Sequence, residues 1–351
     1  MIPILFYSTA TTYTTNGLGR LKDAIKCEVN ETLNSEYYLT LQYPFDGIHA
    51  EDISYRRIIY AQANQDDGKQ AFRIAKIQES LDKRMLTITA NHISYDLSGY
   101  PISPFTATGV ANAISGITSH CLVTQPFTLT TDLTNTTTAF KVSNVKSFRN
   151  CLGGEEGSLI DTFRGELKFD NFAVSLLSSR GSNNGASIRY GKNMESFVNI
   201  RSIDQSYSGM LSYYNSGGTV VTGDVVNTSN YTTFPTPKIL IYDATTEFNS
   251  TPSVANLNSF SSSYISANNI GQPYIDTVTV SFVPLWQTEE YKYLKEFETV
   301  GLGDSVNVVY NGFNTTVKAV EYTYDVLNER YKKMVLGQKK ATLLQTIRQI
   351  T

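Results

Sequence analysis

The sequence predicts a β-rich α+β fold that is divided among several domains. Tyr (23) and Phe (17) far outnumber Met (5) and Trp (1), and aromatic and β-branched residues favour half-buried pleated strands. Many short segments alternate apolar and polar residues with period two, whereas only a few show helical spacing. The chain has 351 residues, more than one hydrophobic core usually serves, which favours two to four domains.

The first 100 residues contain five short alternating segments. In the clearest of them, Tyr37, Leu39, Leu41 and Tyr43 fall on one face. The predicted strands span residues 25–29, 37–43, 57–61, 71–77 and 85–90, and residues 81–84 form the centre of a hairpin. Five short antiparallel strands predict a small barrel or sandwich over residues 1–100.

Residues 101–185 show a mixed helical and extended pattern and predict an α+β domain. Helices are expected over residues 107–117 and 143–152, the second ended by Gly153-Gly154. Ser158-Leu159-Ile160-Asp161 fits a capping box, with Glu155 and Glu156 favourably placed near the helix start. Leu159, Ile160 and Phe163 then share the buried face of a short helix that stops at Gly165. Strands follow over 166–178, with a bulge or tight turn at Asp170-Asn171.

The second half predicts another barrel that carries an insertion. Strands are expected over residues 186–190, 198–213, 305–310, 316–324 and 331–336, so that residues 186–214 and 301–337 form the barrel. Residues 215–300 are rich in polar residues and form the inserted α+β domain, with strands 238–242 and 277–283 and a helix over 289–300. Residues 338–351 form a C-terminal tail or helix.

Two segments near the end of the chain are similar in sequence to two segments near its beginning. Ile58-Ile59-Tyr60 is similar to Val308-Val309-Tyr310, and the hairpin centre 81–84 (LDKR) is similar to 327–330 (LNER). An internal duplication is therefore predicted. It would place residues 57–61 and 85–90 at positions matching 305–310 and 331–336.

Composition excludes several classes of protein. The net charge is −3 with an isoelectric point of about 5.7, and no basic stripe typical of a nucleic-acid binder occurs. Three widely spaced cysteines do not make a disulfide framework or a zinc site, which favours folding in a reducing cytoplasm. The N-terminus lacks signal-peptide features, and no apolar run approaches a membrane span.

The residues that usually carry catalysis do not form a recognisable motif. The three histidines are His49, His92 and His120, and none of them stands in an HExxH motif. Neither a GxSxG motif nor a P-loop occurs in the sequence. His120 and Cys121 are sequence neighbours and would point apart in a strand, while Cys27 and Cys151 read as small buried apolar residues. The sequence therefore predicts no catalytic, cofactor-binding or metal-binding residues, and no enzyme.

Two acidic groups and one Gly-rich segment are explained by local structure and do not indicate a bound ion or phosphate. Asp66-Asp67-Gly68, and Asp161 with Glu166 and Asp170, lack calcium-loop spacing and are interpreted as a solvated turn and a helix cap. Gly153, Gly154 and Gly157 are interpreted as helix termination, since the adjacent acids would repel a phosphate.

Four tyrosines in a polar setting leave two readings open. Tyr207, Tyr213, Tyr214 and Tyr231 could stack on sugars, as in a receptor-binding protein. They also suit a protein interface, where Tyr is enriched, and the interface is favoured.

Four segments resemble the prophage tail family, which includes the N-terminal part of tail-associated lysins. They are residues 31–44 (ETLNSEYYLTLQYP), 152–172 (LGGEEGSLIDTFRGELKFDNF), 180–192 (RGSNNGASIRYGK) and 302–337 (LGDSVNVVYNGFNTTVKAVEYTYDVLNERYKKMVLG). The segments run in family order across nearly the whole chain. The resemblance implies a fold like the baseplate hub of contractile phages, with two β-barrels in each chain and three chains in a ring of pseudo-sixfold symmetry.

The resemblance implies a structural hub in the virion, at the phage tail tip, assembled in the bacterial host cytoplasm. Such a hub would join the tail tube and the distal tail protein ring to the tip and open or close the DNA channel. Expected partners are two further copies, the distal tail ring, the tape measure protein and the tail tube, with the host surface contacted indirectly. DNA would pass without specific binding, so Lys332 and Lys333 are expected at subunit contacts or outside the channel.

Two alternative functions remain at this point. The chain could be the N-terminal part of a tail-associated cell-wall hydrolase whose catalytic domain has been lost or lies beyond Thr351, or a carbohydrate-binding receptor protein.

Overall fold

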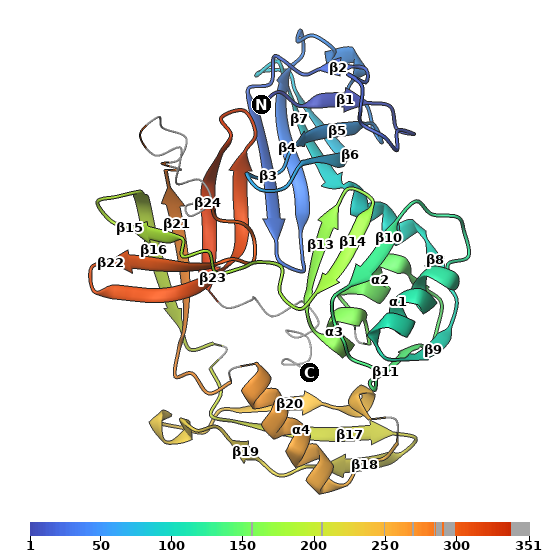
Figure 1. Ribbon diagram of the computed structural model, residues 1–351, viewed down its shortest axis with the longest axis vertical. Coiled ribbons are helices and arrows are strands. Elements are labelled where there is room, and N and C mark those ends of the chain that lie inside the picture. The colour runs from blue at the N-terminus through green and yellow to red at the C-terminus, as the bar shows by residue number, and fades with distance from the viewer. Residues whose placement is uncertain are drawn as a thin grey trace.

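The computed structural model describes residues 1–337 except 156, 205, 249, 269, 284, 286–289 and 291–298. Its largest feature is a 13-stranded sheet whose main path runs β16-β21-β24-β23-β3-β4-β7-β6-β5-β1-β2, with β15 and β22 off this path. Figure 1 shows most of this sheet in blue and red, with β15 and β16 in yellow-green, a green middle unit beside it and a yellow and orange insertion below. The β-rich class predicted from composition is confirmed.

The N-terminal part of the sheet contains the predicted strands and two short ones that the sequence did not indicate. Its strands are β1 (Ile4–Phe6), β2 (Gly19–Arg20), β3 (Lys26–Thr32), β4 (Tyr37–Pro44), β5 (Ile58–Gln62), β6 (Lys69–Ser80) and β7 (Met85–His92), with 3-10 turns η1 (Ala50–Asp52) and η2 (Ile93–Gly99). Tyr37, Leu39, Leu41 and Tyr43 of β4 are all at most 1% exposed, as their spacing predicted.

The C-terminal part of the sheet is formed by β15 (Ser187–Arg189), β16 (Met194–Ser202), β21 (Ile275–Phe282), β22 (Ser305–Tyr310), β23 (Phe313–Asp325) and β24 (Arg330–Gly337). It joins the N-terminal part where β23 pairs antiparallel with β3, with Tyr322 opposite Glu31 and Tyr324 opposite Val29. The strand pairs of the described residues form a continuous open path, so closure into two barrels stays a prediction.

The two parts repeat one strand topology. The order β3-β4-β7-β6-β5 in the first corresponds to β16-β21-β24-β23-β22 in the second, and all these pairs are antiparallel. β6 and β23 each contain a register shift, and each hairpin turn holds a non-glycine residue at positive φ, Arg84 (48°) and Glu329 (54°). We call these five-strand sets the first and second repeat; they place 57–61 and 305–310, and 85–90 and 331–336, at matching positions.

Residues 101–185 form a compact middle unit between the first repeat and the insertion. Its strands are β8 (Pro101–Ile102), β9 (Phe105–Thr108), β10 (Thr128–Thr131), β11 (Ala139–Val142), β12 (Lys146–Ser147), β13 (Glu166–Asp170) and β14 (Ala173–Leu177). Its helices are α1 (Val110–Ser119), α2 (Phe148–Leu152) and α3 (Leu159–Phe163). The predicted helix over 143–152 is wrong in its first half, because residues 146–147 pair with β8 instead.

Two local features of the middle unit confirm the sequence reading. The Ser158 hydroxyl accepts a hydrogen bond from the Asp161 N–H at 3.4 Å and caps α3. Asn171, at φ 50°, makes the tight turn between β13 and β14.

The insertion has different bounds from those predicted. The expected strand 198–213 is two strands, β16 in the large sheet and β17 (Gly209–Ser216) in the insertion, and the expected insertion strand 277–283 is β21 of the large sheet. The remaining elements are β18 (Thr219–Thr222), β19 (Val226–Asn227), β20 (Ile239–Asp243), α4 (Val254–Ala267) and the turns η3 (Tyr231–Thr233) and η4 (Thr245–Glu247). The alternation of Val198 and Ile200 stops at residues 202–209 (SIDQSYSG), and this mostly polar run lies where the chain changes sheet.

The helix α4 was not predicted, whereas the predicted helix over 289–300 lies mostly outside the described residues. Ser and Asn dominate α4, and these residues favour caps and turns over helix interiors. Leu257 and Ser261 nevertheless lie on its buried face against Met210, Leu240 and Tyr242. The tail over 338–351 also lies outside the described residues.

Candidate functional site: the central junction and the sheet edges

Most candidate catalytic residues do not lie together, and they are buried or in contact with other groups of the protein. Cys121 donates its thiol to the Val123 carbonyl at 3.2 Å, and the His120 ring stacks on Phe105 with centroids 4.6 Å apart. Burial raises the pKa of the Cys151 thiol to about 11 and that of Cys27 further, so both are thiols rather than thiolates. Within the described ranges, no group of three or more His, Cys, Asp or Glu side chains is arranged to hold a metal ion. None of the described helices is long and apolar enough to cross a membrane.

His92 is a fully buried histidine of the first repeat. Its ring stacks on Tyr37 with centroids 4.3 Å apart. Nδ1 accepts the Ser94 N–H at 3.2 Å, which leaves Nε2–H to donate to the Gln70 amide oxygen at 3.2 Å. Burial, and then the positive charges of Arg149 and Arg180, hold its pKa well below 6.5. His92 is therefore neutral and structural in this fold.

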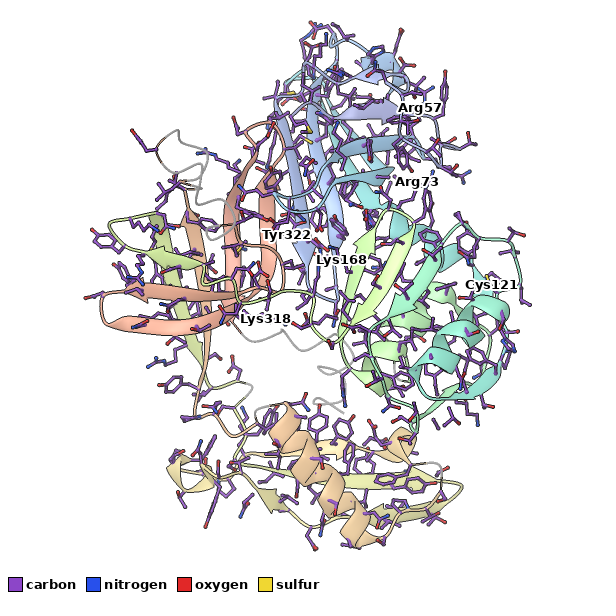
Figure 2. The ribbon with its side chains drawn as sticks, in the orientation of Figure 1. Arg57, Arg73, Cys121, Lys168, Lys318 and Tyr322 are labelled. Carbon is purple, nitrogen blue, oxygen red and sulfur yellow. The ribbon has the colours of Figure 1, made fainter. Side chains whose placement is uncertain are left out.

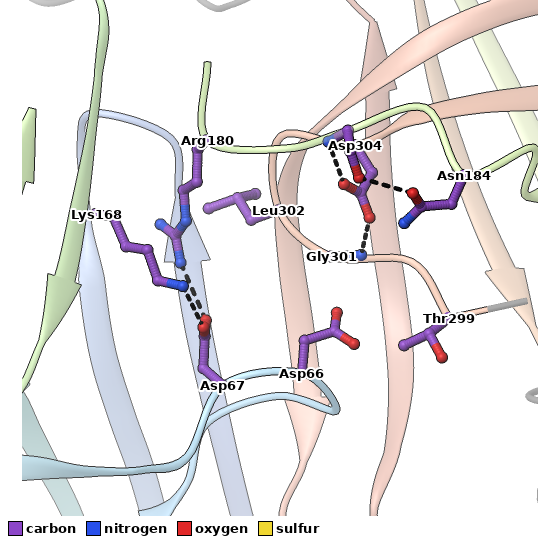
Figure 3. Close-up of a pocket in the computed structure, with 10 residues that line it drawn as sticks. Asp66, Asp67, Lys168, Arg180, Asn184, Thr299, Gly301, Leu302 and Asp304 are labelled. Atoms are coloured by element: carbon purple, nitrogen blue, oxygen red, sulfur yellow. Dashed lines mark hydrogen bonds and ion pairs between the residues drawn. The ribbon is translucent and has the colours of Figure 1, made fainter. Parts of the chain in front are cut away.

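The most strongly charged buried cluster lies where the two repeats and the middle unit meet (Figures 2 and 3). Arg180 follows β14, and its guanidinium forms a two-pronged ion pair with Glu31 of β3, whose NH2–Oε2 distance is 3.1 Å. The side chains of Arg180 and Glu31 are only 4% and 2% exposed. The Tyr322 hydroxyl of β23 donates to Glu31 Oε2 at 2.7 Å. We call Arg180, Glu31 and Tyr322, with Asp67, the central junction.

Asp67 completes the central junction from the β5–β6 loop. Its carboxylate lies 2.7 Å from Lys168 Nζ and 3.4 Å from Arg180 NH2, and it accepts from Asn64 Nδ2 at 2.8 Å. Burial alone would raise the pKa of Asp67, but Lys168, Arg180 and Asn64 outweigh it and lower that pKa. Burial alone would lower the pKa of Arg180, but the Glu31 carboxylate outweighs burial and raises that pKa.

A polar cavity of about 760 Å³ opens beside the central junction (Figure 3). Its lining residues are Asp66, Asp67, Lys168, Arg180, Ser182, Asn184, Thr299, Gly301, Leu302 and Asp304. Asp304 accepts the Gly301 and Ser182 backbone N–H groups at 2.7 Å each, so it fixes the loop before β22 to the segment after Arg180. Opposite charges on its wall already satisfy one another, which suits a joint between chain segments.

The three residues of the second acidic group, Asp161, Glu166 and Asp170, have separate partners in the fold. Glu166 pairs with Lys318 of β23 at 2.6 Å, Asp161 accepts the Gly157 N–H at 2.9 Å, and Asp170 accepts from Gln70 at 2.9 Å. Glu166 was read as part of a helix cap; it is instead 3% exposed and links the middle unit to the second repeat.

The four tyrosines of the insertion do not share one surface. Tyr214 is 8% exposed and faces the core beneath α4, whereas Tyr231 is 49% exposed. Tyr213 is on the other face of β17 and donates to Asp243 at 3.3 Å, and Lys238 lies 5.0 Å above the Tyr207 ring. A sugar-binding platform made of these four rings is therefore not formed.

The large sheet presents one open face and two free edges. Along β4 and β7, Thr40, Gln42, Thr87 and Thr89 alternate with the core residues and are half-exposed. Lys332 and Lys333 lie on this face, where they pair with Glu28 (2.6 Å) and Glu321 (3.1 Å). Two free edges lie at corresponding places of the two repeats: β16, which pairs only with β21, and the end of β6, which pairs only with β7, in the part of the chain that the structure describes. The short strands β2 and β15 end the sheet elsewhere.

Comparisons with known proteins give structures but no sequence family. No protein-family description matches the sequence, and no curated protein matches it. The fold is similar to prophage tail protein gp18 from Listeria monocytogenes (TM-score 0.63, 12% identity, covering 99% of this chain and 98% of that chain). It is equally similar to the 43 kDa tail protein of prophage MuSo2 from Shewanella oneidensis (TM-score 0.63, 12% identity, 99% and 100% covered).

A third similar structure is a tail protein from Neisseria meningitidis (TM-score 0.57, 9% identity, 99% and 98% covered). Each alignment covers nearly the whole of both chains, so the arrangement of repeats, middle unit and insertion is matched rather than one domain. The chain therefore has the fold of the prophage tail proteins.

Proposed function

We propose that this protein is a structural hub at the tip of a phage tail, where three copies form a ring of pseudo-sixfold symmetry. The observation that carries the proposal is the repeat of five strands within one sheet. Three chains with two equivalent repeats offer six similar surfaces to a sixfold tail tube and the distal tail ring, while keeping three copies of everything else. The tail-protein fold supports a place in the virion.

The open face of the large sheet is proposed as the wall of the DNA channel. This differs from the expectation that Lys332 and Lys333 lie at subunit contacts or outside the channel, because both lysines are on this face. The face is rich in Thr, Ser, Asn and Gln, and three of its lysines are paired: Lys26 and Lys332 with Glu28, and Lys333 with Glu321. Lys76, opposite Thr89 on the same face, is exposed and forms no ion pair with the described residues. Burial raises the pKa of Glu28, but Lys26 and Lys332 outweigh it and lower that pKa, so the carboxylate stays charged beside them. Neutralised lysines release few counterions from a passing polyanion and therefore do not hold it.

The role proposed for the central junction is mechanical. It ties both repeats and the middle unit into one body, so that each chain enters the ring as a rigid unit. No catalytic step is assigned to it, because every charged group named there is paired within the protein.

Three measurements test the proposal. Sedimentation at micromolar concentration should show a trimer, or a monomer that trimerises with the distal tail ring; a stable dimer contradicts the ring. Electron microscopy of tails labelled on this protein should place the label at the tip. Purified protein should release no fragments from peptidoglycan, and activity lost in Cys121→Ala would favour the hydrolase instead.

A further inference from the structure

The contact between the two repeats inside one chain suggests how two chains meet. Within the chain, the first strand of the first repeat, β3, pairs with the fourth strand of the second repeat, β23. The corresponding strands on the outer sides are β16 and β6. These are the two free edges described above, so each chain carries both halves of one further contact of the same kind.

The registers of the sheet define which residues correspond. The register shifts of β6 and β23 match Ile74 with Ala319, so residues 76–80 correspond to 321–325. From there, Ala90 corresponds to Leu336 and Leu39 to Val278, because these residues pair across the sheet in turn. Leu39 pairs with Val29 and Val278 with Asn199, so residues 28–32 correspond to 198–202.

We propose that β16 of one copy pairs antiparallel with residues 76–80 of β6 in the next copy, in the register that β3 and β23 use within one chain. Ile200 would then lie opposite the partner's Gln78, as Asn30 lies opposite Thr323 within the chain. Val198 would lie opposite the partner's Ser80. The inference rests on the proposed ring and gives it a residue-level interface.

The free edge of β16 has the properties of a strand that is covered in the assembly. It is nine residues long and exposes Val198 (53%) and Ile200 (59%), and among the described strands only β21 pairs with it. A long apolar edge of this kind aggregates unless a partner strand covers it. Because two different edges meet, the contact is heterologous, and such a contact gives a closed ring when its rotation is one third of a turn.

Charge and shape also fit across this contact. Arg201 would face the partner's Ile77, which places it diagonal to the partner's Glu79, within reach of long side chains on paired strands. In the single chain, Arg201 lies 3.8 Å over the Tyr274 ring. Glu79 stands on the wall of an apolar groove of about 460 Å³ formed with Phe45, Tyr55 and Leu86, which continues the same edge.

Disulfide trapping tests the register directly. Gln78→Cys and Ile200→Cys, in a Cys121→Ser background, place two thiols on directly opposite residues, with Cα atoms about 5 Å apart. Mild oxidation should give covalently linked trimers on a non-reducing gel. The matched control, Gln78→Cys with Ser196→Cys, shifts one thiol by four residues or about 13 Å and should give none.

A charge exchange tests the same contact without cysteine. Arg201→Glu and Glu79→Arg should each raise the dissociation constant of the trimer severalfold, and the double variant should recover most of that loss. A trimer at the tail tip without specific Gln78–Ile200 cross-links, or with additive charge variants, overturns this interface and leaves the ring standing. Failure to form any trimer, with or without the distal tail ring, overturns both proposals.

Discussion

At the scale of single residues, the ion pair of Arg180 with Glu31 is the most consequential interaction. Both side chains are almost fully buried, so removal of one partner leaves a charge without compensation in the interior. Arg180→Met should lower the free energy of unfolding by about 3–5 kcal/mol, measured by urea denaturation. The double variant Arg180→Met/Glu31→Leu should lose clearly less, since the Glu31 carboxylate is gone and Asp67 keeps Lys168 as its partner, and an equal or larger loss would contradict this account.

His92 makes stability depend on pH. Its pKa is about 6.5 in the unfolded chain and well below that in the fold, so only the unfolded state takes up a proton as pH falls through 6.5. Stability should be constant above this value and fall by up to about 1.4 kcal/mol per pH unit below it. His92→Gln should remove that slope between pH 6.5 and 5, as measured by denaturation at each pH. Asp67 and Glu28, whose pKa values are lowered, contribute only at more acidic pH.

At the scale of secondary-structure elements, α3 is held by one aromatic residue. Phe163 is 9% exposed and stacks on Phe140 with centroids 6.1 Å apart, while Leu159 on the same face is fully buried. Phe163→Ala should lower the free energy of unfolding by about 3–5 kcal/mol, as expected for truncation of a buried aromatic side chain. A loss below about 1 kcal/mol in thermal or chemical denaturation would mean that this face contributes little.

The residue after α3 connects the middle unit to the insertion. Arg164 has φ 64° and ψ −157°, a region that is essentially confined to glycine, and its guanidinium lies 5.4 Å over the Tyr264 ring of α4. The insertion has its own hydrophobic core, so this contact is expected to hold its orientation. Arg164→Ala should increase the radius of gyration in small-angle scattering.

Arg164→Gly separates the two roles of this residue. It removes the guanidinium but also relieves about 1–3 kcal/mol of backbone strain, so it should melt at a higher temperature than Arg164→Ala while scattering like it. Scattering curves of both variants that match the unsubstituted protein would show that Arg164 does not position the insertion.

At the scale of the whole molecule, the open sheet face predicts how added charge affects the tail. Thr40→Lys with Thr89→Lys adds two unpaired cations to neighbouring positions of this face, which pair directly across β4 and β7. Tails should assemble normally, and DNA release, followed by a fluorescent dye, should slow at low salt. Thr222→Lys in the insertion is the control and should release DNA at the unsubstituted rate. Failed assembly of the double variant would place this face at a subunit contact instead.

The sequence by itself determined the local elements. Period-two alternation located β4, β6, β7 and the hairpin β23–β24, because side chains on opposite faces of a strand meet different environments. Ser158 and Asn171 likewise marked a cap and a turn whose hydrogen bonds and dihedral angles are local. The weak sequence similarity between residues 81–84 and 327–330 was also visible, since both are hairpin turns after amphipathic strands.

Only the tertiary structure decided which strands become neighbours. Arg180 stood in a turn signal and Glu31 in a strand, and nothing in their spacing of 149 residues indicated that they pair. The division of residues 198–213 between two sheets is also a tertiary property: the run 202–209 interrupts the alternation, but alternation does not indicate which sheet each flanking strand joins. The match of two five-strand repeats, and with it the pair of free edges, is a property of long-range register, which forms only when the whole chain folds.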